Sequence, residues 1–194
     1  MSQETFLQAC DVVDWRHPSI QTQASALQAA AQRNPILVTE ACFLFVRDEI
    51  AHTVDAQGGP VTCAASEALR HRTGYCYAKS HLLAALLRAC GIPAALCYQR
   101  LRLDGPATPF CLHGLNAVWL EPFGWLRIDA RGNKPGVDAR FAPPHEHLAF
   151  PLLHPGESDL PGFYPRPLPA VTHALRTAKG WDRLLTNLPD IGPS

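Results

Sequence analysis

The sequence predicts an α+β fold, with helices in the first half of the chain and an antiparallel sheet after them. Apolar residues recur at helical spacing through the first 90 residues, whereas from residue 96 they alternate with polar residues, as in a strand. Gly91 and Pro93 stand at this change of period, where they end one helix and prevent another. A chain of 194 residues, 47% hydrophobic and 18% charged, can bury a substantial core. We therefore expect a single α+β domain over residues 1–194.

Four helices are expected before the sheet, over residues 19–33, 36–51, 62–70 and 76–90. Ser19 or Thr22 could cap the first helix and Thr62 the third. Residues 52–61, with Gly58-Gly59-Pro60, are expected to form a loop. The leucines of the fourth helix cover most of its circumference, so this helix should be buried centrally.

Three strands are expected over residues 94–103, 113–121 and 125–130, with turn residues at 104–109. Pro122-Phe123-Gly124 favours a hairpin between the last two strands. The chain from residue 131 on is rich in proline and glycine but keeps many apolar residues, so residues 141–194 should wrap over the core. A last helix over 170–188, interrupted at Gly180, completes the prediction.

The balance of charges argues against two kinds of partner. Lys and Arg number 17, as do Asp and Glu, and the sequence has no basic stripe, so neither nucleic acid nor an anionic membrane is expected as a partner. No run of about 18 apolar residues is long enough to span a bilayer. The first residues lack the charged and apolar regions of a signal peptide, so we expect the cytoplasm.

Seven cysteines are present without any CxxC pair, so neither a zinc knuckle nor a redox dithiol is expected. His145-Glu146-His147 alternates metal-ligating residue types, but its middle residue should face the opposite side and no third ligand is apparent. We therefore expect no metal and no cofactor. Most of the cysteines should be small buried hydrophobes, and Cys76 is the one candidate for a catalytic role.

Cys76 stands at the start of the most apolar helix, after a turn that contains Gly74. The first turn of a helix carries unpaired N–H groups and about half a positive charge, which favour a thiolate. The same N–H groups can donate to an oxyanion that forms on a substrate carbonyl. A cysteine at a helix start is more often structural, so a catalytic role requires a base beside it in space.

His113 and Asp129 could supply that base and the group that orients it. His113 begins one strand of the expected hairpin, and Asp129 lies near the end of the other. A tight hairpin would make them cross-strand neighbours, and an aspartate beside a histidine fixes its tautomer and stabilises the imidazolium. Singly, His113 could be a polar residue at a strand edge and Asp129 a turn residue or a partner of Arg127 or Arg131. Together with Cys76 they predict a Cys-His-Asp triad.

Three segments resemble the transglutaminase-like superfamily. GYCYAKSHLLAALLRACGIPA is similar to its nucleophile helix, and HGLNAVWLEPFGWLRIDA to its histidine strand, Gly-Trp turn and strand that ends in Asp. FVRDEIAHTVDA resembles the helix that precedes the nucleophile in bacterial members. The resemblance covers a core of about residues 36–134. It implies a papain-like core with Cys76 as the nucleophile, His113 as the general base and acid, and Asp129 as the orienting residue.

The chemistry implied by this resemblance is acyl transfer. Cys76 would attack an amide or thioester carbonyl, His113 would protonate the leaving amine, and the acyl-enzyme would pass to water or to an amine. We expect hydrolysis of a peptide or amide substrate, because the sequence offers no recognisable surface for an amine acceptor. Two alternatives stay open: a transglutaminase that uses an amine acceptor, and an inactive binding module on the same fold.

Some details depart from the superfamily pattern or stay undecided. Gly114 follows His113 where many members have Ala-Trp, so one wall of the pocket should be more open. No acidic cluster resembles a calcium site. His52 and Gln57 lie where a second oxyanion donor could stand, although a solvated loop explains both more simply. Residues 131–134 could line the cleft or form a surface turn, and residues 141–194 could cover the cleft.

Overall fold

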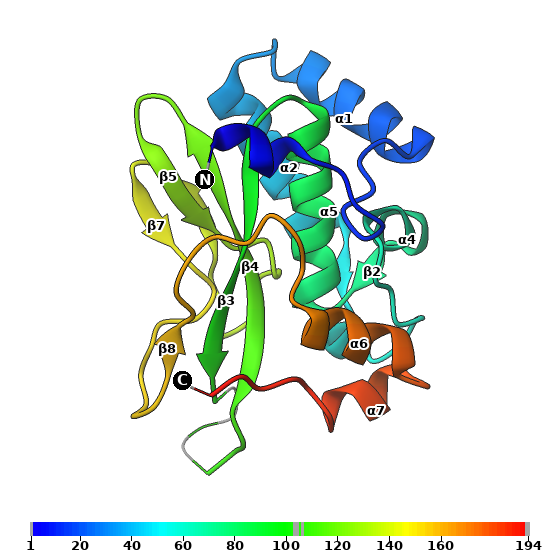
Figure 1. The fold of residues 1–194 in the computed structure, drawn as a ribbon, viewed down its shortest axis with the longest axis vertical. Helices are drawn as coiled ribbons and strands as arrows, with labels where there is room; N and C mark the ends of the chain where they lie inside the picture. The colour runs from blue at the N-terminus through cyan, green and yellow to red at the C-terminus, as the bar shows by residue number, and fades with distance from the viewer. Residues whose placement is uncertain (1, 103–104, 106, 193–194) are drawn as a thin grey trace.

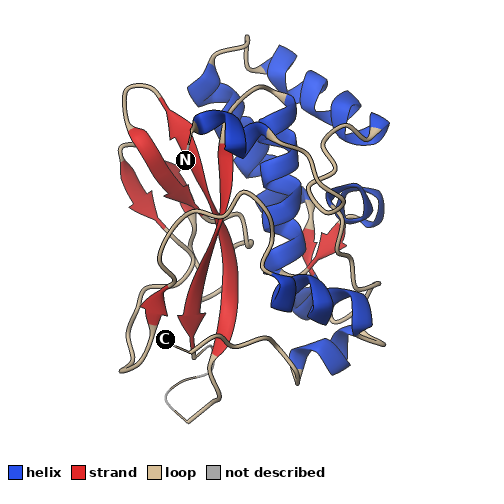
Figure 2. Ribbon diagram, in the orientation of Figure 1, coloured by secondary structure: helices blue, strands red, loops and turns tan. Residues whose placement is uncertain are grey.

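The computed structural model describes residues 2–102, 105 and 107–192 and has an α+β architecture, as predicted (Figures 1 and 2). A twisted antiparallel sheet lies on one side, most of the helices lie on the other, and α5 runs between them (Figure 1). The helices are η1 (Gln3–Leu7), α1 (Pro18–Ala30), α2 (Pro35–Glu49), α3 (Thr53–Ala56), α4 (Ala65–His71), α5 (Cys76–Ala89), α6 (Pro169–Thr177) and α7 (Trp181–Leu185). The strands are β1 (Ala51–His52), β2 (Thr73–Gly74), β3 (Ala94–Leu101), β4 (Cys111–Leu120), β5 (Gly124–Ile128), β6 (Arg140–Ala142), β7 (His145–His147) and β8 (Ser158–Asp159).

The predicted helices are present, but the caps differ from those predicted. His17 caps α1 by accepting a hydrogen bond from the Ser19 N–H, so neither Ser19 nor Thr22 is the cap. The prediction of Thr62 as the cap of α4 is also wrong, because its buried hydroxyl donates to the Thr73 carbonyl at 3.0 Å. The Glu67 carboxylate instead accepts from two N–H groups before α4. The N–H groups at these helix starts are therefore satisfied by His17 before α1 and by Glu67 in the first turn of α4.

Residues 52–61 are more ordered than the predicted loop. Ala51 and His52 form a short parallel ladder with Thr73 and Gly74, and α3 follows directly. This ladder holds the end of α2 beside the turn that leads into α5. The ladder could not be predicted from local pattern, because two-residue strands carry no periodicity.

Helix α5 is buried over almost its whole length, as its leucines predicted. Gly91 follows it with a φ of +77°, and the Ile92 N–H returns to the Leu87 carbonyl at 2.9 Å, which closes the helix end. Arg88 in the last turn is 2% exposed and donates to three carbonyls, those of Gln8, Ala94 and Pro165. These bonds join α5 to the N-terminal segment, to β3 and to the C-terminal segment.

The main sheet has the strand order β5-β4-β3-β8, with antiparallel neighbours throughout. Its hairpin between β4 and β5 turns through Phe123 and Gly124, as predicted. The predicted end of β3 at Leu103 and the turn residues Asp104 and Pro106 lie outside the described residues. Strand β3 does not show the predicted alternation of buried and exposed residues, because both faces of the sheet are covered.

The second face of the sheet carries a small core of its own. Five buried residues form it, with partly buried side chains packed on them: Phe6, Ala95, Cys97, Leu115 and Ala117, covered by Trp125, Leu148 and Phe163. Leu148 and Phe163 belong to the proline-rich segment, and Tyr164 pairs with Leu96 through two backbone hydrogen bonds. The C-terminal segment thus wraps the core as predicted, and it ends in α6 and α7, separated at Gly180. No helix in the described ranges is both long and apolar enough to cross a membrane.

Candidate active site

Cys76 is the first residue of α5 and lies at the floor of a cavity. The N-cap residue, Tyr75, contributes no side-chain hydrogen bond, so the first N–H groups of the helix are not occupied by a capping side chain. The Cys76 Sγ lies 3.5 Å from the Gly114 N–H of β4, and the residue is 8% exposed. The nucleophile candidate is therefore held against the sheet while its helix presents N–H donors beside it.

His113 lies between Cys76 and Asp129. Its Nε2 is 2.7 Å from the Asp129 Oδ2, and the Cys76 sulfur is its second electrostatic partner. Burial alone would lower the pKa of His113, but the Asp129 carboxylate and the Cys76 sulfur outweigh this effect and raise the pKa to about 10. The three predicted residues are thus brought together, with an imidazolium between two partners that favour its charge.

The strand register differs from the predicted one by two residues. Asn116 pairs with Ile128, so the next step of the ladder would set Asp129 opposite Leu115, and His113 lies two positions further along β4. His113 and Asp129 are therefore diagonal neighbours on one face of the sheet instead of a direct pair. A diagonal pair is still within reach, because a histidine side chain can cross the roughly 7–8 Å between diagonal positions.

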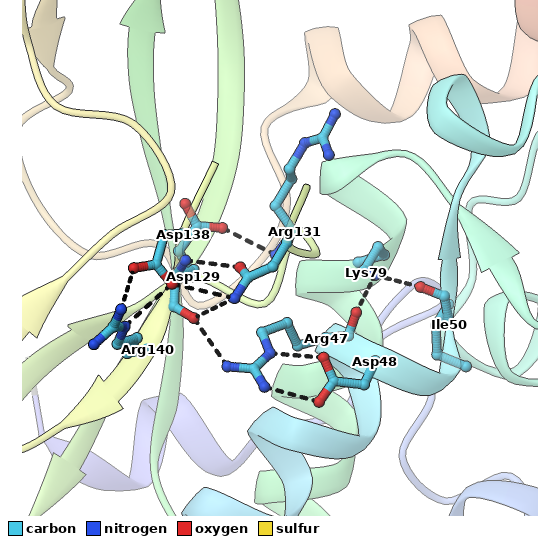
Figure 3. Close-up of polar contacts among 10 residues, drawn as sticks. Arg47, Asp48, Ile50, Lys79, Asp129, Arg131, Asp138 and Arg140 are labelled. Atoms are coloured by element: carbon cyan, nitrogen blue, oxygen red, sulfur yellow. Dashed lines mark hydrogen bonds and ion pairs between the residues drawn. The ribbon is translucent and has the colours of Figure 1, made fainter. Parts of the chain in front are cut away.

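Asp129 is fully buried and accepts three hydrogen bonds. Besides the His113 ring, the backbone N–H groups of Arg131 and Ala149 donate to it, each at 3.1 Å. Figure 3 shows the Arg131 backbone turned toward Asp129 while its guanidinium points away. Next to Ala149, the Phe150 ring packs edge-on against the His113 ring, with centroids 4.9 Å apart. The C-terminal segment therefore fixes both the aspartate and the histidine.

A buried lysine of α5 connects the nucleophile helix to the end of α2. Lys79 lies one turn after Cys76, is 1% exposed, and donates to the carbonyls of Arg47 and Ile50 at the end of α2 (Figure 3). Burial, with a contribution from the nearby Arg131 cation, lowers the pKa of Lys79 to about 7. Lys79 thereby ties the end of α2, and the β1 strand that follows it, to the nucleophile helix.

The segment after Asp129 lines the cleft. Of the two alternatives for residues 131–134, a cleft wall and a surface turn, the structure therefore favours the cleft wall. Arg131 and Lys134 both line the cavity, and both form ion pairs with Asp55 of α3. Burial opposes the charge of Asp55, but the two cations lower the pKa of this carboxyl to about 2. The carboxylate holds the two cations at the cavity wall.

The cavity has a volume of about 480 Å³, within the range of ligand pockets. Cys76, His113, His52 and Arg131 lie on its polar side. Eight aliphatic or aromatic side chains also line it: Val54, Leu101, Leu112, Val137, Phe150, Leu153, Leu185 and Leu188. The C-terminal segment and α7 are therefore walls of this cavity.

Gly114 does not open the pocket as expected. A Cβ added there would lie 2.9 Å from the Cδ1 of Tyr77 and 3.2 Å from its Cα. The Tyr77 ring fills the space, and its hydroxyl donates to the Leu112 carbonyl at 2.5 Å. The glycine permits β4 to approach α5 closely, and this approach brings the Gly114 N–H to the Cys76 sulfur.

His52 and Gln57, the two candidates for an oxyanion donor, separate clearly in the structure. Gln57 is exposed and does not line the cavity. His52 is buried, so the simpler interpretation of it as part of a solvated loop is wrong, and its ring lies at the cavity wall. No sequence signal distinguished the two residues, because the burial of His52 depends on its pairing with Gly74.

The residues considered for metal binding have other contacts. Glu146 pairs with Arg127, and the His147 ring lies 3.5 Å from Asp138. In the part of the chain that the structure describes, no group of three or more His, Cys, Asp or Glu side chains is arranged to hold a metal ion.

A central helix headed by Cys76 faces His113 and Asp129 on an antiparallel sheet, which is the arrangement that the resemblance to the transglutaminase-like superfamily implies. Residues 22–130, more than half of the chain, match the sequence profile of the transglutaminase-like superfamily, and the chain belongs to this superfamily. No curated protein sequence matches the chain significantly.

Two solved structures of the periplasmic domain of TgpA from Pseudomonas aeruginosa, one of them bound to ethylmercury, are similar to this chain. Both are 24% identical to it, with TM-scores of 0.51 and 0.50, over 66% and 67% of this chain. The matched region is 48% of the TgpA domain in both comparisons, so this chain spans about half of that domain. The likeness concerns the fold.

Proposed function

We propose that the protein is a cysteine-dependent acyltransferase acting on amide bonds, with hydrolysis as its main reaction. The observation that carries this proposal is the grouping of Cys76, His113 and Asp129, in which His113 bonds to Asp129 and interacts with the Cys76 sulfur, at a cavity of ligand size. Within the cysteine–histidine–aspartate triad, Cys76 is the nucleophile, His113 the general acid and base, and Asp129 the orienting residue.

The reaction begins from the thiolate–imidazolium pair. The Cys76 thiolate attacks the substrate carbonyl carbon, a C–S bond forms, and the carbonyl electron pair moves to oxygen. The C–N bond then breaks as the His113 proton passes to the leaving amine, which leaves a thioester on Cys76. Water attacks the thioester while His113 takes its proton, and the C–S bond breaks to release a carboxylic acid and restore the ion pair.

An apolar peptide or amide is the substrate class that the cavity favours. Leu153 and Leu185 line it and are 71% and 41% exposed, so both present apolar surface to a bound substrate. Arg131 and Lys134, although paired with Asp55, add cationic groups at one wall and would favour a carboxylate or carbonyl near the apolar side chain. Nucleic acid and membrane are not proposed as partners, because the net charge is zero.

We place this reaction in the cytoplasm. All seven cysteines are free thiols in the structure, and several of them are buried in the core. A reducing compartment is the ordinary setting for such a set of thiols.

A mixture of tryptic casein peptides, incubated with and without putrescine, tests the proposed reaction. We expect the wild-type protein to generate new carboxyl termini, detected by mass spectrometry after reaction in H₂¹⁸O, and the Cys76→Ala variant to generate none. Putrescine adducts in place of ¹⁸O-labelled termini would favour the transglutaminase alternative. If neither product forms and iodoacetamide labels Cys76 no faster than the other cysteines, the chain is an inactive binding module.

A further inference from the structure

His52 lies beside the nucleophile although it belongs to a different element. Its Cα pairs with that of Gly74, two residues before Cys76, in the parallel ladder of β1 and β2. Its ring contacts Tyr75, with centroids 5.8 Å apart, and lines the same cavity as Cys76 and His113. The ladder therefore carries an imidazole to the head of α5, where a substrate carbonyl would meet the thiolate.

The His52 ring has unused hydrogen-bonding capacity. Its Nδ1 is shut off from solvent and has no hydrogen-bond partner among the described residues. The nearest carboxylate, Asp55, is 4.0 Å away and is already bound by Arg131. The Nε2 atom also makes no hydrogen bond in the described part of the chain, but unlike Nδ1 it is not shut off from solvent. Buried polar groups are normally paired, so a 9% exposed imidazole with a free nitrogen at a cavity wall indicates a ligand contact.

The environment keeps this imidazole neutral. Burial lowers the pKa of His52 strongly, and the cations of Arg131, Lys79 and His113 act in the same direction, while Asp55 opposes them. A neutral imidazole carries one proton. Because an unpaired buried N–H is rarer in proteins than an unpaired buried acceptor, we assign the proton to Nε2, the ring nitrogen that is not shut off from solvent.

We propose that the Nε2–H of His52 donates to the oxyanion of the tetrahedral intermediate, together with the backbone N–H groups at the start of α5. This inference rests on the proposed acyl transfer. As the thiolate attacks, the carbonyl electron pair moves to oxygen and His52 stabilises that charge without giving up its proton. The proton for the leaving amine still comes from His113, so the two histidines have separate roles.

Two probes with different transition states test this role. Acylation of Cys76 by p-nitrophenyl acetate passes through an oxyanion, whereas alkylation by iodoacetamide does not. We expect His52→Leu to slow acylation about 100-fold, the usual effect of losing one oxyanion donor, and to leave alkylation at pH 6 within about twofold of wild type. His52→Gln, whose Nε2 can replace the lost donor, should recover most of the acylation rate. His71→Leu, an exposed histidine of α4, is the matched control and should change neither rate.

Four outcomes would overturn the inference. Equal losses in acylation and alkylation would indicate that His52 only supports the local structure. Unchanged acylation in His52→Leu, or a His52→Gln variant no faster than His52→Leu, would show that no donor acts at this position. A wild-type protein that is alkylated rapidly at Cys76 but never acylated would instead refute the proposed acyl transfer itself, and the His52 role with it.

Discussion

Replacing His113 with alanine is expected to slow amide cleavage on the order of 10⁴-fold and to slow iodoacetamide alkylation of Cys76 at pH 6 about 100-fold. The alkylation rate follows the thiolate population, and an isolated thiol with a pKa near 8.5 is almost fully protonated at pH 6. His113 supplies the proton acceptor for that thiol and the proton donor for the leaving amine, so its loss affects amide cleavage more than alkylation. Mass spectrometry of labelled peptides measures the alkylation rate of each cysteine separately.

Two further variants make this result specific. His113→Gln keeps a polar side chain between Cys76 and Asp129, so it protects the fold and should be nearly as slow as His113→Ala. His173→Ala removes an exposed histidine of α6 and should alter neither rate. A His113→Ala protein that is folded, by circular dichroism, and still labels Cys76 at the wild-type rate would refute the thiolate–imidazolium pair.

The His113 ion pair also predicts how stability depends on pH. The pKa of His113 is raised from 6.5 to about 10 on folding, so its contribution to stability is fully present below pH 6.5 and is lost as the pH rises through 10. Lys79 has the opposite sign, because its pKa is lowered from 10.5 to about 7 and its penalty disappears as the pH rises through this range. The two slopes partly cancel in the wild-type protein.

The difference between wild type and His113→Gln isolates the histidine, because Lys79 is present in both proteins. We expect the difference in the free energy of unfolding, from urea titrations, to shrink steadily between pH 6.5 and 10. A difference that stays constant over this range would mean that His113 is not protonated in the folded protein.

The parts of the site that the sequence predicted are those encoded over short distances. The head of α5 follows from a glycine turn before a leucine-rich helix, and the β4–β5 hairpin follows from its turn residues and two short strands. Cys76, His113 and Asp129 therefore come from two local features. The two-residue error in register shows the limit of this reasoning, because hairpin length alone does not fix which residues oppose one another.

The remaining parts of the site depend on contacts between distant segments. Nothing in the sequence marks Ala149 as a backbone donor to Asp129, because every residue except proline offers the same N–H group. In the sequence, Phe150 is one of many apolar residues in a proline-rich segment, and only the structure shows that its ring packs against His113. The cavity is visible only once α3, the 131–137 segment, the C-terminal segment and α7 are assembled around Cys76.

Lys79 and His52 illustrate a second limit. A lysine in a helix is expected at the surface. Lys79 is nevertheless buried, and its ammonium group donates hydrogen bonds to two carbonyls at the end of α2. His52 follows a helix and precedes a glycine-rich segment, which predicts exposure. Its burial results from a two-residue parallel ladder that has no sequence signature. Both residues were expected to be exposed and are buried instead, and both lie next to the candidate site.

The Asp129→Asn variant should lose on the order of 10³- to 10⁴-fold in amide cleavage while remaining folded. The two carboxylate oxygens accept from His113, Arg131 and Ala149. An asparagine has one oxygen and an NH₂ group, so at least one of these three N–H donors would face another donor. If the His113 Nε2–H faces it, the ring is no longer held as an imidazolium oriented toward Cys76. The Ala149 N–H donates to the same oxygen, Oδ2, so an amide nitrogen at this place also releases the segment that carries Phe150. An amide nitrogen at the place of Oδ1 faces the Arg131 N–H instead. In both orientations the negative charge that stabilises the His113 imidazolium is lost, which lowers the rate.

Steady-state cleavage of a peptide found in the casein screen gives kcat and KM separately, and the loss should fall in kcat, because Asp129 is buried and does not reach the cavity. Asp138→Asn is the matched control: this carboxylate also follows β5 in the chain, but it is exposed and contacts Arg140, His147 and the Asn133 side chain, none of which lines the cavity, so its loss should leave kcat unchanged. An Asp129→Asn protein with more than a tenth of the wild-type kcat would mean that the aspartate fixes the structure without stabilising the charge on His113. In that case the histidine would have to be oriented by Phe150 alone, and Phe150→Ala, not Asp129→Asn, would be the variant that abolishes cleavage.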